Sequence, residues 1–311
     1  MPKMSLPEIT PLPTADLAYE NPEFIESPDA RILRILAEYQ EPLNRFRREH
    51  IQDTVVFFGS ARILPLDVAT QRLVAIDTAP KHGSPEDEET ANKRKAAETD
   101  IEMARYYEDA RKLAYLLADW SKGLPGRLRR FVVTSGGGPG IMEAANRGAS
   151  EAGGKTIGLN IALPFEQHPN PYITPSLNFQ FHYFFMRKFW LAYMAKALVV
   201  FPGGFGTFDE MFELLTLAQT RKFSKPMTII VYGSDYWNSV INVNALVEKG
   251  VISHEDKDLF RFADTPEDAF AILKESLLKH CPTCSPHDRV PEDSPKSVQD
   301  MLGPDIASTR A

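Results

Sequence analysis

Two glycine-rich turns carry the residues best suited to bind a phosphorylated ligand. The first runs from Ser135 to Gly140 and reads Ser-Gly-Gly-Gly-Pro-Gly, and the second runs from Pro202 to Thr207 and reads Pro-Gly-Gly-Phe-Gly-Thr. Each turn follows a short apolar run and precedes a helix-like stretch. Such a junction brings free backbone N–H groups and the positive end of a helix dipole to one place, where phosphate binds readily. Two turns of this kind in one sheet predict a pocket for a phosphorylated small molecule.

Neither turn matches a standard nucleotide-binding fingerprint. Ile141 and Met142 follow Gly140, so the first turn lacks the third glycine of the G-x-G-x-x-G pattern. The second turn lacks the Gly-Lys-Ser/Thr ending of a P-loop, so ATP hydrolysis is not expected. A tight strand–helix connection that needs positive φ remains the structural alternative for the first turn.

Three charged residues near the second turn have both a structural and a functional interpretation. Glu210 follows Thr207 by three residues, the spacing of a capping box, but it is also placed to touch a sugar ring beside the turn. Arg187 and Lys188 interrupt an apolar stretch, where cations are costly unless they are paired. They either pair with a structural acid or extend out to solvent, or else they pair with a group of the site, namely Glu210 or a ligand phosphate.

The elements that must position these residues alternate between strands and helices. The pattern predicts strands at 54–58, 131–134, 155–161, 197–201 and 227–232, and helices at 31–48, 139–152, 183–196, 206–221, 235–249 and 266–279. The alternation predicts an α/β, Rossmann-like three-layer fold, with a parallel sheet covered by helices on both faces. The ligand is then expected at the carboxyl ends of the strands. We expect one catalytic domain over 29–280 with an insertion at 63–109, and proline-rich tails at 1–28 and 281–311.

Composition narrows the expected partners and location. The chain has 311 residues, 43% of them hydrophobic, and a net charge of −7, which disfavours nucleic acid as a partner. No apolar run is long enough for a membrane span, and the start at Met1 has no signal core, so a cytoplasmic location is expected. One compact cluster of zinc-type ligands lies in a proline-rich tail and consists of His280, Cys281, Cys284 and His287. So compact a cluster is a weak signal for zinc, so no metal is expected. No cofactor is expected either.

Taken together, three segments of this sequence resemble the LONELY GUY (LOG) family of cytokinin-activating phosphoribohydrolases, often labelled "lysine decarboxylase". The segments are 135–143, Met186-Arg187-Lys188 and the P-G-G-x-G-T-x-x-E string that ends at Glu210. The resemblance covers roughly residues 54 to 250. It implies a Rossmann-like fold and hydrolysis of the N-glycosidic bond of a nucleoside 5′-monophosphate, either AMP or a cytokinin riboside 5′-monophosphate. A non-catalytic nucleotide sensor or scaffold that uses the same pocket is the alternative. No lysine site for pyridoxal phosphate is recognisable, which disfavours an amino-acid decarboxylase.

The resemblance also assigns expected roles to individual residues. Arg187 and Glu210 match the family's catalytic pair. Its nucleotide-binding residues match Lys188 and the second turn, namely Gly203, Gly204, Phe205, Gly206 and Thr207. Two further residues outside the turn match its substrate contacts less directly: Glu166 and Thr216. The remaining expected substrate contacts lie on the other turns: Gly59, Ser60, Gly137, Gly138 and Met142. Plant-type members have no counterpart to the segment 63–109. The apolar helix at 183–196 and the resemblance both predict a homodimer or a higher homo-oligomer.

Overall fold

The computed structural model describes residues 14–78, 88–164, 168–222 and 227–279. The chain divides between Glu41 and Pro42 into two compact units. In the first unit, α1 (Pro22–Glu26) and a 3-10 turn precede the beginning of α2 (Arg31–Arg48). Arg34 Nη1 donates hydrogen bonds to the carbonyls of Ile25 (2.5 Å) and Ser27 (2.7 Å), which fixes the turn between the two helices. The expected boundary at residue 28 stays a prediction.

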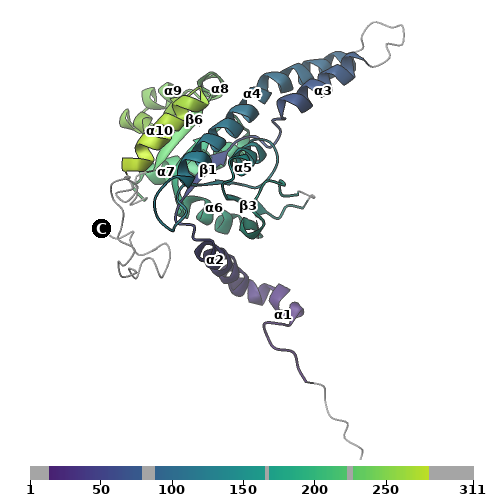
Figure 1. Ribbon diagram of the computed structural model, residues 1–311, viewed down its shortest axis with the longest axis vertical. Helices are drawn as coiled ribbons and strands as arrows, with labels where there is room; N and C mark the ends of the chain where they lie inside the picture. Colours follow the sequence, from purple (N-terminus) through teal and green to yellow (C-terminus); the bar gives the residue numbers. More distant parts are fainter. Residues whose placement is uncertain (1–13, 79–87, 165–167, 223–226, 280–311) are drawn as a thin grey trace, which may run out of the picture. The chain divides into compact units, whose positions relative to one another are not determined.

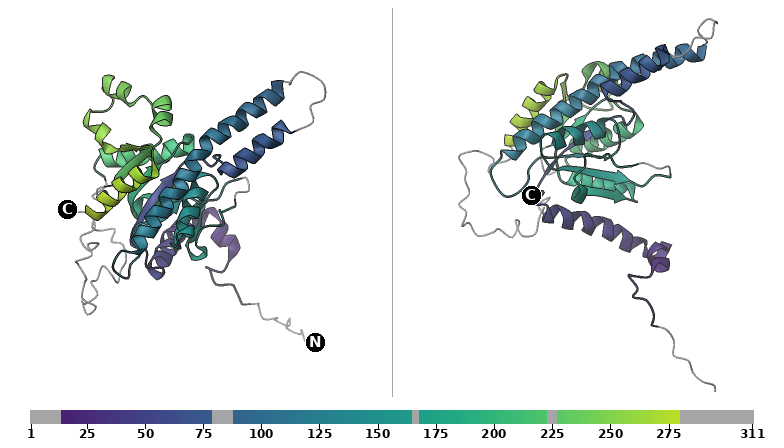
Figure 2. Two further views of the ribbon diagram at one scale, coloured as in Figure 1. Left: turned by 45° about the horizontal axis from the view of Figure 1, so that its top comes forward. Right: turned by 45° about the vertical axis from the view of Figure 1, so that its right-hand side comes forward.

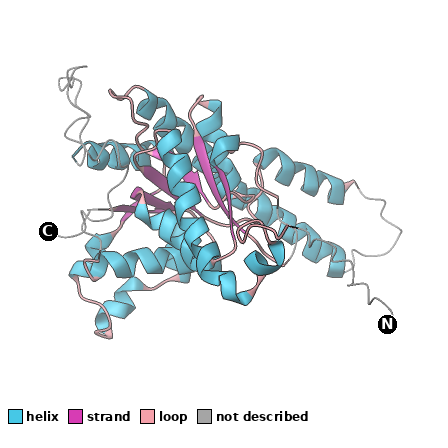
Figure 3. Cartoon of the chain, turned by 90° about the horizontal axis from the view of Figure 1, so that it is seen from below, coloured by secondary structure: helices cyan, strands magenta, loops and turns pink. Residues whose placement is uncertain are grey.

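In its described residues, the second unit contains one sheet of seven parallel strands in the order β4-β3-β2-β1-β5-β6-β7. Their bounds are β1 Thr54–Phe58, β2 Val132–Ser135, β3 Thr156–Ile161, β4 Asn178–Phe181, β5 Ala195–Val200, β6 Thr228–Tyr232 and β7 Arg261–Ala263. Figure 3 shows the strands enclosed by helices on both sides. The predicted α/β three-layer fold with a parallel sheet is confirmed, and the sequence analysis missed the short strands β4 and β7.

The helices that follow the strands are α5 to α10. Their bounds are α5 Ile141–Glu151, α6 Phe184–Tyr193, α7 Phe205–Gln219, α8 Ser234–Val240, α9 Val243–Glu248 and α10 Pro266–Lys279. The expectation of one helix over 235–249 is wrong, because Asn242 caps α9 by accepting a hydrogen bond from Ala245 N at 3.0 Å. In the described part of the chain, the helices lack the combination of length and apolarity that crossing a bilayer requires.

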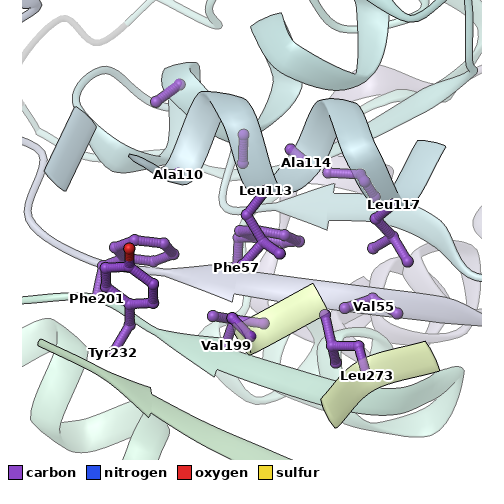
Figure 4. Close-up of a cluster of buried hydrophobic side chains, with 14 of the residues drawn as sticks. Val55, Phe57, Ala110, Leu113, Ala114, Leu117, Val199, Phe201, Tyr232 and Leu273 are labelled. Atoms are coloured by element: carbon purple, nitrogen blue, oxygen red, sulfur yellow. The ribbon is translucent and has the colours of Figure 1, made fainter. Parts of the chain in front are cut away.

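Central strand β1 shows why the sequence folds into a covered sheet. All five of its residues, Thr-Val-Val-Phe-Phe, are buried, as is typical of a parallel strand packed on both faces. Successive side chains alternate between the faces, so Val55 and Phe57 lie in the core beneath α4, α5 and α10 (Figure 4). At the C-terminal end of α2, the ring of Phe46 lies 5.0 Å from that of Phe179 and 5.3 Å from that of Trp190.

A helical extension follows β1 and consists of α3 (Leu66–Asp77) and the N-terminal part of α4 (Glu88–Lys122). Helix α4 has 35 residues and is roughly 52 Å long at the rise of an α-helix, and its C-terminal part is a core helix on the sheet. Figures 1 and 2 show α3 alongside the N-terminal part of α4. Arg72 and Asp100 join the two helices at 2.6 Å, whereas Leu113, further along α4, is fully buried on the sheet. Within the described residues, the expected insertion at 63–109 therefore contains α3 and the first part of a core helix.

The strand order fixes where loops from different parts of the chain converge. From β1 the chain adds strands in one direction through β4, then crosses back and adds β5, β6 and β7 on the other side of β1. The loops after β1 and β5 therefore lie side by side at the carboxyl edge, where open α/β sheets bind ligands. Ser60 N donates to the carbonyl of Pro202 at 2.9 Å and joins these two loops.

Candidate functional site

A cavity of about 850 Å³ opens at this carboxyl edge, between the loops after β1 and β5. The second glycine turn and the beginning of α7 form one wall, and α4 contributes Asp100 and Met103 to another. Most of the residues that the sequence predicted for the site line this cavity. They are Gly59, Ser60, Met142, Arg187, Gly203, Gly204, Phe205, Gly206, Thr207 and Glu210.

Arg187 of α6 and Glu210 of α7 form an ion pair in the cavity wall. Nη2 of Arg187 donates to Oε1 of Glu210 at 2.9 Å, and the two side chains are only 14% and 7% exposed. The sequence left open whether Arg187 pairs with a structural acid or with the site, and its partner is Glu210. Nε of Arg187 is buried and makes no hydrogen bond within the described chain. The guanidinium therefore has donor capacity left for a ligand.

Burial raises the pKa of Glu210 above its ordinary value of 4.5. The positive charges of Arg187 and Lys188 act in the opposite direction, and the pair's hydrogen bond adds to that effect. A carboxylate that is dehydrated and held by one guanidinium interacts strongly with any positive charge that develops beside it.

The second turn leads directly into α7, which begins at Phe205 with Gly204 as its N-cap. The capping-box interpretation is wrong, because no side chain caps this helix and Glu210 bonds Arg187 instead. Tyr236 donates its hydroxyl to the carbonyl of Gly203 at 2.8 Å and so holds the turn from the opposite wall. Uncapped N–H groups at this end of α7 remain available to an anion.

The first turn contributes less of its backbone to the cavity than the sequence suggested. Gly136 lines the cavity, but Gly137 and Gly138 turn their carbonyls to Asn170, whose Nδ2 donates to them at 3.0 and 3.1 Å. Gly137 has φ 77°, and a Cβ there would lie 2.3 Å from Oδ1 of Asn160. The alternative of a tight connection that needs positive φ therefore describes Gly137.

Lys188 and Thr216 lie beside the cavity rather than on its wall, in an open groove along α7. Lys188 bonds Asp209 and Glu213, both at 2.8 Å, which anchors α6 to the outer side of α7. Thr216 is exposed and its hydroxyl donates to the carbonyl of Phe212 in the preceding turn. The structure therefore places neither residue on the cavity wall.

Two sequence interpretations fall outside the described residues. Glu166 is one, and the potential zinc ligands His280, Cys281, Cys284 and His287 are the other. Within the described ranges, the acidic, histidine and cysteine side chains form no group that could hold a metal ion.

The sequence analysis missed several residues of the cavity wall, among them Arg62, Asp100, Met103 and Tyr236. Arg62 could have been found, since it follows Ser60 by two residues in the loop after the first strand. The other three reach the cavity from helices whose sequences carry no glycine motif, so only the tertiary arrangement reveals them.

Comparisons with known proteins agree with this geometry. The family model described as "Possible lysine decarboxylase" matches residues 142–273, which include Arg187, Glu210 and the second turn. A probable cytokinin riboside 5′-monophosphate phosphoribohydrolase of Oryza sativa subsp. japonica is 27% identical over 146 residues, covering 46% of this chain and 58% of that protein. A cytokinin riboside 5′-monophosphate phosphoribohydrolase of Arabidopsis thaliana is 23% identical over 177 residues, covering 56% of this chain and 78% of that protein.

Among solved structures, a Moco carrier protein from Chlamydomonas reinhardtii is 19% identical and superposes with a TM-score of 0.41, over 73% of this chain and 99% of that one. The first plant relative is matched over less than two thirds of its own length and the second over more. The family model spans the ion pair and the second turn, so over this region the chain is similar to the LONELY GUY (LOG) phosphoribohydrolases.

Proposed function

We propose that the chain is a hydrolase that cleaves the N-glycosidic bond of a nucleoside 5′-monophosphate and releases the free base and ribose 5-phosphate. One observation carries the proposal: the buried pair of Arg187 and Glu210 faces the same cavity as the second glycine turn. Binding a phosphate alone requires neither a buried carboxylate nor its guanidinium partner, so the pair favours catalysis over a nucleotide sensor.

The chemistry follows from the charges that develop in the reaction. When the bond between C1′ and the base nitrogen breaks, both electrons leave with the base and the ribose becomes oxocarbenium-like. The carboxylate of Glu210 stabilises that positive charge, while Arg187 holds Glu210 ionised and binds the phosphate or the departing base. Water supplies a hydroxyl to C1′, and the base takes up the proton. The N–H groups at the beginning of α7 bind the 5′-phosphate.

We propose AMP and cytokinin riboside 5′-monophosphates as substrates, the latter because they are named for the plant relatives. Asp100 and Met103 of α4 lie on the wall of the cavity, so the extension is in a position to influence which base is accepted. No cofactor enters the proposed reaction. The cytoplasmic location of the protein stays a prediction from the sequence.

The first experiment is to incubate the protein with AMP and to measure free adenine and ribose 5-phosphate by chromatography. The test variant is Glu210→Gln, and the control is Glu248→Gln, which removes a carboxylate from the exposed surface of α9. Loss of an electrostatic group of this kind costs about 10² to 10³ in rate. We therefore expect Glu210→Gln to lose that much turnover and Glu248→Gln to retain wild-type turnover.

The outcomes distinguish a hydrolase from a nucleotide sensor and test the role of Glu210. Release of adenine that depends on Glu210 supports the hydrolase and leads to a comparison of bases under the same conditions. Turnover of Glu210→Gln within a few-fold of wild type overturns the role of Glu210. Binding of AMP without release of any base, with cytokinin nucleotides equally inert, favours the sensor.

We further propose that the chain forms a homodimer through aromatic residues at the beginnings of α6 and α7. Phe184, Phe185 and Phe205 are 51%, 55% and 96% exposed, although each is a large apolar residue. Singly exposed apolar residues are common, but a group of them beside a cavity is typical of an interface. Light scattering at micromolar concentration tests this proposal, and a mass near 34.9 kDa, that of one chain, contradicts it.

A further inference from the structure

Arg62 occupies a defined place on the wall of the cavity. It lies in the loop after β1, where its backbone N donates to Oγ of Ser60 at 3.1 Å. Ser60 N in turn donates to the carbonyl of Pro202, the first residue of the second glycine turn, at 2.9 Å. The backbone of Arg62 is thus tied by two hydrogen bonds to the turn that we expect to bind phosphate.

The charges around the cavity leave Arg62 without a counter-ion. Among the described residues, the charged side chains that line it are two cations and two anions: Arg62, Asp100, Arg187 and Glu210. Arg187 pairs with Glu210 at 2.9 Å, and Asp100 pairs with Arg72 of α3 at 2.6 Å. Both carboxylates are therefore already engaged by arginines. Arg62 is exposed, and no hydrogen bond or ion pair joins its guanidinium to a described side chain.

A free guanidinium beside an uncapped helix N-terminus is suited to a dianionic group. Its planar fork of N–H donors matches the oxygens of a phosphate in a bidentate arrangement. The backbone N–H groups of the turn reach the same group from the direction of α7. The turn itself carries no cationic side chain between Pro202 and Thr207, so Arg62 would add a positive charge to its backbone donors.

We propose that Arg62 binds the 5′-phosphate of the substrate together with the second glycine turn, and that this contact selects nucleoside 5′-monophosphates over nucleosides. The inference rests on the proposed function for the identity of the substrate, while the anion contact itself is testable without catalysis. Arg62 is a binding residue in this scheme, and the bond cleavage remains with Glu210 and Arg187.

Calorimetry with ribose 5-phosphate tests the contact directly. The test variant is Arg62→Gln, and the control is Arg261→Gln, which removes one exposed positive charge on strand β7, away from the cavity. A hydrogen bond to a charged group corresponds to a change of about 10- to 100-fold in affinity. We expect Arg62→Gln to bind ribose 5-phosphate that much more weakly, Arg62→Lys to lose less, and Arg261→Gln to stay within two-fold of wild type.

Kinetics with AMP and adenosine provide the second measurement. Arg62→Gln should raise KM for AMP by a similar factor, leave kcat within a few-fold, and leave any slow cleavage of adenosine unchanged. Unchanged affinity for ribose 5-phosphate in Arg62→Gln overturns the role of Arg62, even if the wild type hydrolyses AMP. A wild type that binds ribose 5-phosphate through Arg62 but cleaves no nucleotide overturns the proposed function alone. A wild type that binds neither ribose 5-phosphate nor AMP overturns both.

Discussion

Glu210 and Arg187 come from different helices, and their side chains meet at 2.9 Å in the wall of the cavity. The positive charge of Arg187 acts to lower the pKa of Glu210, and it acts strongly because both side chains are largely removed from water. Burial nevertheless keeps the pKa of Glu210 above 4.5, so the pair has not fully offset the cost of dehydrating the carboxylate.

This shift predicts the pH dependence of turnover. The ionised form of Glu210 is the active one in the proposed mechanism, and its raised pKa means that protonation begins at a higher pH than for an exposed glutamate. We therefore expect kcat for AMP to fall on acidification with a midpoint above pH 4.5. The measurement uses saturating AMP, because kcat reports the bound complex and because free phosphate monoesters also titrate near pH ~6. A kcat that stays constant down to pH 4.5 contradicts the assignment.

Replacing Arg187 by methionine should move that midpoint. The positive charge of Arg187 is the main influence that lowers the pKa of Glu210, so its loss leaves burial unopposed. We expect the acid limb of kcat in Arg187→Met to shift to higher pH than in wild type, along with a fall in turnover of about 10²-fold or more. Arg187→Lys keeps a positive charge and should shift the limb less. If the two variants have the same acid limb as wild type, the pair does not control the ionisation of Glu210.

The second turn should tolerate a methyl group at one glycine and not at another. A Cβ on Gly203 would lie 2.1 Å from Oγ1 of Thr207 and 3.0 Å from Ser60 N, whereas nothing lies within 4 Å of a Cβ on Gly206. We expect Gly203→Ala to lose about 1 to 3 kcal/mol of unfolding free energy, because Thr207 is buried and the loop of Ser60 must shift. Gly206→Ala should have a free energy of unfolding within about 1 kcal/mol of that of wild type. Thermal denaturation of both variants checks this, and equal midpoints would contradict it.

Asn170 should hold the first turn in place. Its Nδ2 donates to the carbonyls of Gly137 and Gly138 and to Oδ1 of Asn146, all within the buried interior. Asn170→Ala leaves these acceptors without that donor, at a cost of about 1 to 3 kcal/mol of unfolding free energy. Asn170→Asp should be worse, because it sets a buried negative charge against three oxygens. Urea denaturation gives both values, and an Asp variant as stable as wild type would contradict the predicted network.

Local sequence patterns were sufficient where a residue's role is set by its immediate neighbours. The buried run of β1 and the glycines after β5 correctly located the sheet and the cavity, because short apolar runs and glycine turns are local signals. Strand β7 has only three residues, two of them exposed, and the pattern of so short an edge strand does not stand out. The break at Asn242 was missed because a helix cap depends on one side chain rather than on periodicity.

Contacts between distant segments could not be read in the same way. The pairing of Arg187 with Glu210 was one of two open alternatives until the structure brought α6 and α7 together. The engagement of Gly137 by Asn170 joins residues 33 positions apart, and the sequence of the turn alone gives no indication of it.

The continuity of α4 affects how this protein can diversify. Met103 on the cavity wall and Leu113 in the core belong to one uninterrupted helix, so the extension is fused to the sheet and is not appended as a separate domain. Substitutions at its cavity-facing positions can therefore accumulate on a rigid support while the strands, the turns and the ion pair stay unchanged. Under the proposed function, we therefore expect substitutions on the cavity-facing side of α4 to change which base is accepted without changing the residues proposed to cleave the bond.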